Sequence, residues 1–336
     1  MTQKEDMNMD CPVCGCPCHG VPSARYSIAK AAAHFCPPGR DLDRYNRLVE
    51  CIDRLWNHRD CVVLHCPECG FGFGLPFRSG DEEFYGILHE EHSYPTWRWD
   101  YGLAMRLAID RLGGGRILDV GAGTGAFLTS LPKTWAPHAI EGSDTIRTQL
   151  RSNEIIVFDN MQAAKEAVGG TVDVVTLFQV LEHIAEFREM LSDCRSLLRA
   201  GGILIVTVPE ASAMLRQEKI TGCADMPPNH INKWTTKSLA IALENAGFHP
   251  GEAFFEPVSL RSIRGVLHLR ILADRKGPGS WASRIYRFQN RKVRAALLAL
   301  LALPAFFKLA PHLTHLCRRT AFAMVAVANS SAPQSR

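Results

Sequence analysis

The sequence predicts an α/β fold, a doubly wound and mainly parallel seven-stranded sheet with helices on both faces, preceded by a small cysteine-rich module. From residue 115 onward, short apolar segments alternate with segments of helical periodicity, which is typical of a parallel sheet with crossover helices. Ahead of that region, nine of the twelve cysteines lie before residue 70. We therefore expect an N-terminal module at residues 1–96 and the sheet domain at residues 97–336.

Composition narrows the class of protein. The chain has 336 residues, of which 46% are apolar and 21% charged, with a formal charge of +4. These values are ordinary for globular proteins and argue against disorder and against nucleic acid as the main partner. The first ten residues carry acids and lack the apolar core of a secretory signal, which predicts a cytoplasmic protein.

Two copies of one short pattern predict a metal site. Cys11-Pro-Val-Cys14-Gly and Cys66-Pro-Glu-Cys69-Gly both have the Cys-x-x-Cys-Gly form of zinc knuckles. Two knuckles complete a tetrahedral site and leave no open position for catalysis. We therefore predict a zinc-knuckle module with structural zinc on Cys11, Cys14, Cys66 and Cys69. The alternative ligands are Cys16, Cys18 and His19, which crowd the first knuckle.

The long spacer between the knuckles contains apolar residues at helical spacing, which predicts an inserted helix. These residues are Leu42, Tyr45, Leu48, Val49, Ile52 and Leu55.

The stretch from residue 116 to residue 125 reads as an apolar strand that ends in a glycine-rich turn. Gly121, Gly123 and Gly125 remove side chains where the backbone must pass close to a ligand. We expect the next helix to begin at Ala126, with its amide groups facing the turn.

The same glycines also fit a dinucleotide-binding pattern, which is weak evidence when it stands alone. Asp119 argues against a dinucleotide, because a carboxylate there would crowd a pyrophosphate but could hold the ammonium of a methionine group. Glu141 closes the next strand and can accept both ribose hydroxyls, which either kind of cofactor would supply.

The order of the later segments decides between these cofactors. The stretches ILDVGAGTG, FDN, VDVVTLFQVLEHI and LLRAGGILIVTVP resemble the successive motifs of class I S-adenosylmethionine-dependent methyltransferases, over about residues 97–250. The resemblance implies a methyltransferase domain at residues 97–336 and S-adenosylmethionine as its cofactor. It also implies a role for each motif residue. Asp119, Gly121, Gly123 and Gly125 would contact the methionine part, Glu141 the ribose, Asp159 with the backbone of Asn160 and Met161 the adenine, and Phe178 and Gln179 the sulfonium.

Phe178 has a second explanation, as a core residue at the end of a strand.

The N-terminal stretch HCPECGFGFGLPF, followed by FYGILHEEHSYP, is similar to the zinc-binding region of some bacterial methyltransferases, many of which act on sugars or secondary metabolites. We therefore expect a small-molecule or glycan-precursor acceptor.

Methyl transfer needs an aligned nucleophile and a group that removes its proton. The candidate bases are His183 and His230, since both are expected in loops at the carboxyl ends of strands. Glu182 could orient His183 or reach the amino group of the cofactor. In ubiquinone-type O-methyltransferases a similar loop reads Glu-x-x-Glu-His and can hold a divalent ion. Gln179 occupies the first of those positions here, which argues against a catalytic metal.

The C-terminal region predicts a basic helical insertion at about residues 258–320. It has thirteen Arg or Lys against one acid, Asp274. The apolar run from residue 295 to residue 307 contains Pro304 and is shorter than the ~20 residues that cross a bilayer, so we expect no spanning helix. This run could lie on the inner membrane as a peripheral contact, or it could be a lid helix buried on the domain.

Two rival functions remain open. The chain could be an RNA methyltransferase whose zinc module binds the nucleic acid, although the module is rich in acids close to the knuckles. It could also be a non-catalytic zinc-dependent interaction protein. The sequence predicts neither the acceptor atom nor the oligomeric state.

Overall fold

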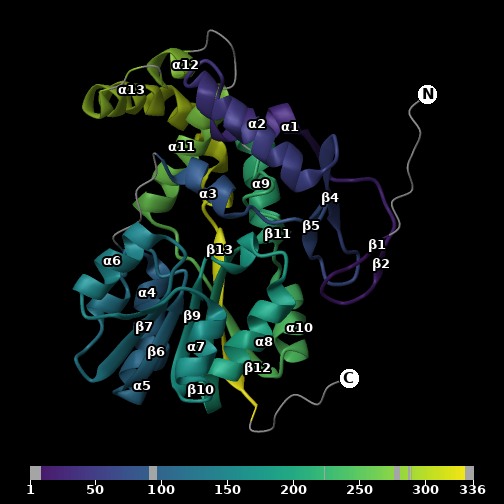
Figure 1. The fold of residues 1–336 in the computed structure, drawn as a ribbon. Helices are drawn as coiled ribbons and strands as arrows, with labels where there is room; N and C mark the ends of the chain where they lie inside the picture. Colours follow the sequence, from purple (N-terminus) through teal and green to yellow (C-terminus); the bar gives the residue numbers. More distant parts are fainter. Residues whose placement is uncertain are drawn as a thin grey trace.

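The computed structural model describes residues 9–90, 97–222, 224–275, 281–286, 288 and 290–329. Figure 1 shows three parts: a large sheet covered by helices, the cysteine-rich module beside it, and a group of C-terminal helices at the end of the molecule away from the C-terminus. The described residues form a seven-stranded sheet, a four-stranded sheet and a two-stranded hairpin.

The seven-stranded sheet has the order β12-β13-β10-β9-β6-β7-β8. Five adjacent strands, β10, β9, β6, β7 and β8, are parallel, and β13 is antiparallel to both of its neighbours. The predicted mainly parallel seven-stranded sheet is therefore confirmed. The strand bounds are Gly115–Val120 (β6), Trp135–Ile140 (β7), Ile156–Phe158 (β8), Val172–Phe178 (β9), Leu198–Pro209 (β10), Phe248–Phe255 (β12) and Ala321–Ala328 (β13).

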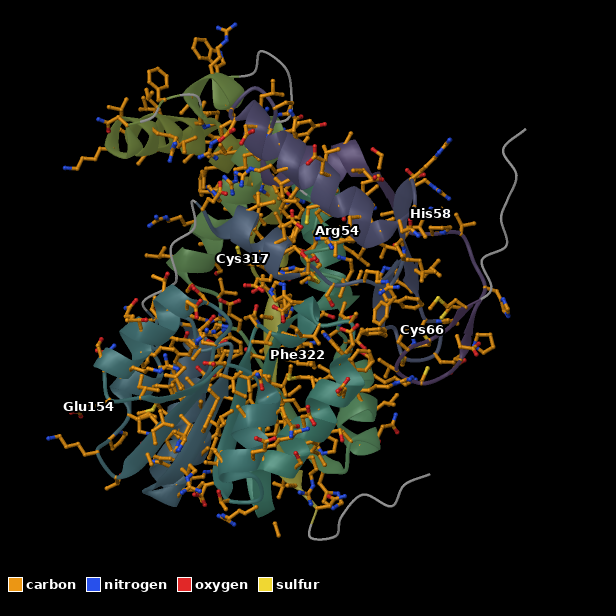
Figure 2. All side chains as sticks on the ribbon, viewed as in Figure 1. Arg54, His58, Cys66, Glu154, Cys317 and Phe322 are labelled. Carbon is orange, nitrogen blue, oxygen red and sulfur yellow. The ribbon has the colours of Figure 1, made fainter. Side chains whose placement is uncertain are left out.

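Helices cover both faces of this sheet because successive strand residues point to opposite sides. One face packs on α4 (Trp99–Ala104) and α6 (Asp144–Ser152), through residues such as Ile117 and Val174. The other packs on α7 (Met161–Val168), α8 (Phe187–Leu197) and α10 (Thr236–Asn245), through residues such as Leu118 and Val175. Phe322, labelled near the centre of Figure 2, is fully buried near the start of β13.

The chain changes direction across the sheet at β6. The connections from β6 lead to β7 and β8 on one side, whereas β9 and β10 lie on the other side. In open α/β sheets, ligands bind where two such connections part, outside the carboxyl ends of the strands. The loops after β6 and β9 meet at this point.

The helix expected from Ala126 is not formed, and this prediction was wrong. After the glycine turn the chain makes only a short 3-10 helix, η2 (Leu128–Ser130). Pro132 follows at once and β7 already begins at Trp135, which leaves too few residues for a longer helix. A preceding π-helix, η1 (Met105–Ile109), and α5 (Asp110–Leu112) bring the chain into β6.

The N-terminal module is built around the four-stranded sheet, whose order is β11-β5-β4-β3. Its elements are β1 (Met9–Asp10), β2 (Pro17–Cys18), β3 (Ala24–Ser27), α1 (Ile28–Phe35), α2 (Leu42–Trp56), β4 (Asp60–His65), β5 (Gly72–Leu75) and α3 (Glu82–His89). The expected inserted helix is α2. The edge strand β11 (Asn232–Lys233) comes from the second half of the chain and pairs with β5. The module and the sheet domain therefore share one sheet.

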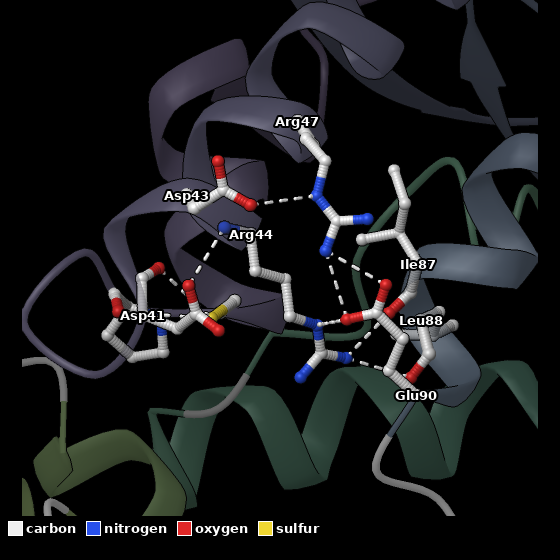
Figure 3. A network of polar contacts seen from close by, with 9 residues as sticks. Asp41, Asp43, Arg44, Arg47, Ile87, Leu88 and Glu90 are labelled. Atoms are coloured by element: carbon white, nitrogen blue, oxygen red, sulfur yellow. Dashed lines mark hydrogen bonds and ion pairs between the residues drawn. The ribbon is translucent and has the colours of Figure 1, made fainter.

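A buried arginine ties α2 to the end of α3 (Figure 3). The guanidinium of Arg44 donates to the carbonyl oxygens of Ile87, at 2.8 and 3.0 Å, and of Leu88, at 3.0 Å. A cation at the last carbonyls of a helix satisfies acceptors that have no partner within the helix. Beside Arg44, Glu90 and Arg47 form an ion pair, in which Oε1 of Glu90 lies 2.9 Å from Nη2 of Arg47. This contact fixes α3, which carries Tyr85 toward the sheet domain.

The C-terminal helices lie between β12 and β13. They are α11 (Leu260–Arg275), α12 (Trp281–Tyr286), α13 (Arg291–Leu309), η4 (Ala310–His312) and α14 (Leu313–Leu316), and α11 and α14 contact α9 (Ala211–Thr221). The helical stretch Lys292–His312 is 21 residues long with a mean hydropathy of 1.9, so by length and composition alone it could cross a membrane. The expectation that this segment is too short to cross a bilayer is contradicted by length and composition, because the helical stretch extends beyond residues 295–307 at both ends. Only 11% of its most apolar window is buried, which also contradicts the buried-lid alternative.

Candidate active site

Asp119 is buried at the carboxyl end of β6. Its Oδ1 accepts a hydrogen bond of 2.7 Å from Thr176 on the neighbouring strand β9. Burial raises the pKa of this carboxyl to about 7, against the lowering effect of Thr176 and of Arg98. A cationic ligand beside Asp119 would favour the ionised form.

The glycine turn needs its glycines for two different reasons. Gly121, Gly123 and Gly125 all have positive φ, at 70, 52 and 75°, where side chains are rarely accommodated. A Cβ on Gly125 would also lie 2.5 Å from a methyl group of Leu150. Glu141, directly after β7, accepts from the backbone N–H groups of Gly123 and Ser143, each at 3.0 Å. The carboxylate expected to hold a ribose is thus fixed against the turn.

A cavity of about 280 Å³ opens between these loops. It lies where the loop after β6 meets the loop after β9, and α3 and α4 border it. Its lining residues are Tyr85, Arg98, Tyr101, Asp119, Gly121, Ala122, Gly123, Thr124, Phe178, Gln179, Val180, His183 and Asn229. The structure therefore brings together the expected methionine-contacting residues Asp119, Gly121 and Gly123, the sulfonium-bordering pair Phe178 and Gln179, and the candidate base His183.

Four residues at this site were missed from the sequence. Arg98 and Tyr101 line the cavity from α4, and Tyr85 reaches it from α3. Asp100, fully buried behind them, pairs with Arg98 at 2.7 Å and accepts from Thr207 at 2.8 Å. No spacing pattern marks these residues, and Tyr85 meets a partner 98 positions further along the chain.

His183 lies at the end of η3 (Leu181–His183), directly after β9. Its Nδ1 is 2.7 Å from the carbonyl oxygen of Asn229. A carbonyl can only accept, so Nδ1 carries the proton and the neutral ring keeps an unprotonated Nε2. The Tyr85 hydroxyl lies 3.2 Å from the same Nδ1. Nε2 is therefore the nitrogen that can take a proton.

His230 lies next to His183 but is not among the cavity-lining residues. The two rings meet edge to face with centroids 4.7 Å apart. Nδ1 of His230 is 2.5 Å from Asp225, which is also paired with Lys233 at 2.7 Å. Burial lowers the pKa of His230, but Asp225 outweighs burial and raises it overall. α9 separates this loop from β10, so His230 does not follow the strand directly as expected.

Glu182 is almost completely buried beside the two histidines. Burial raises the pKa of its carboxyl to about 7, and its Oε1 lies 3.9 Å from Nε2 of His183. Oε2 has no hydrogen-bond partner among the described residues. The possible ligand atoms of Glu182, His183 and His230 all lie within 4.8 Å of one another. Glu182 can stabilise a protonated His183. The three residues are also close enough together to bind a metal cation.

Phe178 is the last residue of β9 and Gln179 is the first residue after it, and the two side chains have different surroundings. Phe178 packs against Tyr101 and Phe127, with ring centroids 5.0 and 4.9 Å away, as a core residue would, and it also lines the cavity. Its contact with a cofactor stays a prediction. Gln179 has a positive φ of 57°. Its buried Nε2 has no partner among the described residues. An amide that lines a cavity without a partner is a ready donor to a ligand.

The expected adenine contacts lie outside this cavity. Asp159 is exposed and pairs with Arg147 at 3.1 Å. Asn160 caps α7, accepting from the N–H of Ala163 at 3.0 Å, and Met161 is the first residue of that helix. These three residues follow β8, which β6 and β7 separate from β9 and from the loop that carries His183. Their role stays a prediction.

The four knuckle cysteines come together in the N-terminal module, where Figure 2 labels Cys66. Sγ of Cys11 lies 3.6 Å from Sγ of Cys69, and Sγ of Cys14 lies 3.5 Å from Sγ of Cys66. All four sulfurs lie within 4.8 Å of one another. Both knuckles have the same turn, with Gly15 and Gly70 at a φ of 73°. This group includes none of the alternatives Cys16, Cys18 and His19.

Comparison with known proteins agrees with this geometry. Residues 97–251 match a sequence family described as "Methyltransferase domain". The chain is 29% identical over 180 residues to a ubiquinone biosynthesis O-methyltransferase of Cereibacter sphaeroides, covering 50% of this chain and 66% of that protein. It is 22% identical over 187 residues to a probable S-adenosylmethionine-dependent methyltransferase of Mycolicibacterium smegmatis, covering 54% of this chain and 68% of that protein.

Among solved structures, the chain is similar to an S-adenosylmethionine-dependent methyltransferase from Archaeoglobus fulgidus. The TM-score is 0.45 and the identity 14%, covering 73% of this chain and 99% of the other. The sequence matches and the observed strand order carry the assignment. Residues 97–251 form a methyltransferase domain of the S-adenosylmethionine-dependent class. The expected methyltransferase class is thereby confirmed for these residues.

Proposed function

We propose that this protein transfers a methyl group from S-adenosylmethionine to a small-molecule or glycan-precursor acceptor, with His183 as the general base. The observation that carries this proposal is that one cavity contains both the glycine turn with Asp119 and the ring of His183. This supports a site in which the cofactor and the acceptor are bound side by side, within reach of His183.

The residues present fit the cofactor. Asp119 would hold the ammonium of the methionine part, and Glu141 the ribose hydroxyls. Gln179, whose amide lacks a partner among the described residues, would donate to an oxygen of the ligand. S-adenosylmethionine supplies an activated methyl group when bound, so the protein must align the acceptor and remove its proton.

The proton would pass to Nε2 of His183. As the methyl group is transferred, the acceptor loses its proton to this nitrogen and His183 becomes a cation. Glu182, with Oε1 3.9 Å away, stabilises that cation. Asn229 holds the ring in the tautomer that leaves Nε2 free. His230 acts on the ring of His183 as a positioning residue rather than on the acceptor, since it does not line the cavity.

The acceptor atom is open among oxygen, nitrogen and carbon. Relatives that share about half of this chain are named ubiquinone biosynthesis O-methyltransferases, which is a reason to test hydroxyl-bearing acceptors first. Whole-protein activity is part of the proposal, because the Cereibacter relative is covered over only 66% of its length.

The four knuckle cysteines would hold one structural zinc. Sulfurs bound tetrahedrally at the usual zinc–sulfur distance lie about 3.8 Å apart, close to the 3.5 and 3.6 Å found here. Cysteines that bind a metal rather than form disulfides are typical of a reducing compartment, so a cytoplasmic location is part of the proposal.

One labelling experiment tests the proposal against its two rivals, an RNA methyltransferase and a non-catalytic interaction protein. The purified chain is incubated with methyl-labelled S-adenosylmethionine and metabolite extracts, and labelled products are identified by mass analysis. Label in a small molecule or glycan precursor supports the proposal. Label in ribonuclease-sensitive material would favour an RNA acceptor, and cofactor binding without label in any extract would favour a non-catalytic interaction protein.

The role of His183 has its own test, because the same group of residues suits a cation. Elemental analysis should find one zinc per chain. A second bound metal that is lost in His230→Ala would replace the base proposal with a metal site at Glu182, His183 and His230.

A further inference from the structure

The helix α13 exposes an apolar face that nothing in the described structure covers. Residues at alternating spacings of three and four place Val293, Ala296, Leu300, Leu303 and Phe307 on one side of the helix, all exposed. The side chains of Leu300, Leu303 and Phe307 are 71%, 62% and 69% exposed. This alignment is unlike the scattered single apolar residues found on most protein surfaces.

The opposite face of α13 is already used for packing. Ala305 is buried against Ile271 and Ala282, which belong to α11 and α12. Leu309 is buried against Val266 and Leu316. The helix is therefore apolar on both faces, and its fold requires only one of them. The exposed face must be explained by something outside this part of the chain.

The positive charge of the C-terminal region indicates which kind of partner would cover this face. Residues 258–320 carry thirteen Arg or Lys against one acid. Exposed Lys292 and Lys308 lie near the two ends of α13, so they flank the apolar face. Long basic side chains can extend to a headgroup layer while the apolar residues between them enter it.

A large aromatic side chain is exposed on the neighbouring helix α12. Trp281, at the start of α12, is 70% exposed, and the guanidinium of Arg284 lies 5.4 Å from its ring centroid. Tryptophan is enriched where an apolar ring meets a hydrated headgroup layer. A groove between α11 and α13, lined by residues such as Leu260, Leu298 and Ala302, continues the apolar surface beside Arg264.

This surface is on the same side of the molecule as the cavity. α11 follows the end of β12, and α14 leads back to β13 at Ala321, which pairs with Pro209 at the carboxyl end of β10. The C-terminal helices thus rise from the edge of the sheet at which Asp119 and His183 lie, as Figure 1 also shows.

We propose that the exposed face of α13, together with Trp281, docks on the surface of an anionic phospholipid bilayer. The helix lies in the headgroup layer with Leu300, Leu303 and Phe307 inserted, and Lys292 and Lys308 pair with lipid phosphates. Pairing of α13 with α11 and α12 holds the helix against the domain, so the contact is peripheral. The proposal concerns this surface alone and stands whether or not the chain transfers methyl groups.

The test is sedimentation of the full chain with vesicles. Vesicles of phosphatidylcholine containing roughly one third phosphatidylglycerol should pull down the protein, and vesicles of phosphatidylcholine alone should do so much less. Raising the salt from about 0.1 M to about 0.5 M should weaken the binding, since the screening length falls. Leu303→Glu with Phe307→Glu should reduce the bound fraction at least tenfold.

Two controls keep the result specific. Val21→Glu places one glutamate at another exposed apolar residue, in the loop between β2 and β3, and should bind as the wild type does, whereas Leu303→Glu alone should bind less. Lys292→Glu with Lys308→Glu should remove the preference for anionic vesicles. Equal thermal midpoints of all variants would show that the fold is intact, because the altered side chains are exposed.

Several results would overturn the proposal. Absence of sedimentation with either vesicle, or unchanged binding of the Leu303→Glu and Phe307→Glu double variant, contradicts lipid docking. A wild-type dimer that the double variant does not form would assign the face to a second copy of the chain. Bound protein that resists extraction with alkaline carbonate would assign α13 to a helix that spans the bilayer.

Discussion

Thr176 donates a hydrogen bond of 2.7 Å to Oδ1 of Asp119 across the adjacent strands β9 and β6. The bond holds the carboxyl at the edge of the cavity and engages one of its oxygens. Since burial nevertheless raises the pKa of Asp119 to about 7, the charge of this carboxyl changes near neutral pH. Cofactor binding should therefore depend on pH.

The affinity for S-adenosylmethionine should rise with pH through this window. Below the pKa Asp119 is neutral and attracts the ligand ammonium weakly, whereas above it the carboxylate is formed. A ligand that requires the ionised form gains roughly tenfold in affinity between about pH 6 and about pH 7.5. Calorimetric titration of the wild type at several pH values measures this slope.

Two variants assign the slope to Asp119. Asp119→Asn should bind weakly and without this pH dependence. Thr176→Val removes a bond that favours the ionised form, so the rise should move to higher pH. A slope that disappears in Glu182→Gln instead would show that the other raised carboxyl, also near 7, controls binding.

His183→Ala should reduce kcat by about two orders of magnitude and leave the Kd for S-adenosylmethionine within about twofold, because general-base groups act on the acceptor. Steady-state kinetics and calorimetry measure the two quantities. Tyr85→Phe serves as the control, since it removes a hydroxyl 3.2 Å from Nδ1 and leaves Nε2 in place. Activity of His183→Ala within threefold of the wild type would exclude this histidine as the base.

Gly125→Ala should lower the free energy of unfolding by about 1–3 kcal/mol, because the residue has a positive φ and its Cβ would overlap Leu150. Urea unfolding measures the change. Gly86→Ala is the matched control: it lies in α3 with open space around a Cβ, so alanine should be neutral or slightly stabilising. Equal effects at both positions would contradict the account of the turn.

Cys66→Ser should abolish the bound zinc and lower the thermal midpoint, because binding energy of a structural zinc contributes to folding. Cys16→Ser, outside the four-sulfur group, should keep one zinc per chain. Elemental analysis of both purified variants makes the comparison. Loss of zinc in Cys16→Ser with retention in Cys66→Ser would contradict the proposed ligand set.

The sequence predicts the parallel strands because they are apolar runs and the glycine turn fixes where the first one ends, whereas the mixed composition of β12 gives no such signal. It predicts His183 because the residue follows a strand directly. It does not predict Arg98, Asp100 or Tyr85, since only the fold brings these to the cavity. β11 was also missed, because two residues carry no periodicity and pair only where β5 offers an open edge.

The C-terminal helices also show what cannot be predicted from the sequence. The apolar run was expected to cover residues 295–307 and to be too short to cross a bilayer, yet α13 begins at Arg291 and continues to Leu309. Nor does composition tell whether an apolar helix is buried, since the exposed and packed faces of α13 are equally apolar. Which face is covered depends on contacts with α11 and α12, and these form only in the folded chain.

Calorimetric titration of the purified chain with S-adenosylmethionine and S-adenosylhomocysteine, beside a nicotinamide and a flavin dinucleotide, tests the cofactor assignment most directly. We predict one site per chain for the two sulfur nucleosides, at least tenfold weaker in Asp119→Ala, and no binding of either dinucleotide. Binding of a dinucleotide with no response to the sulfur nucleosides would contradict the account.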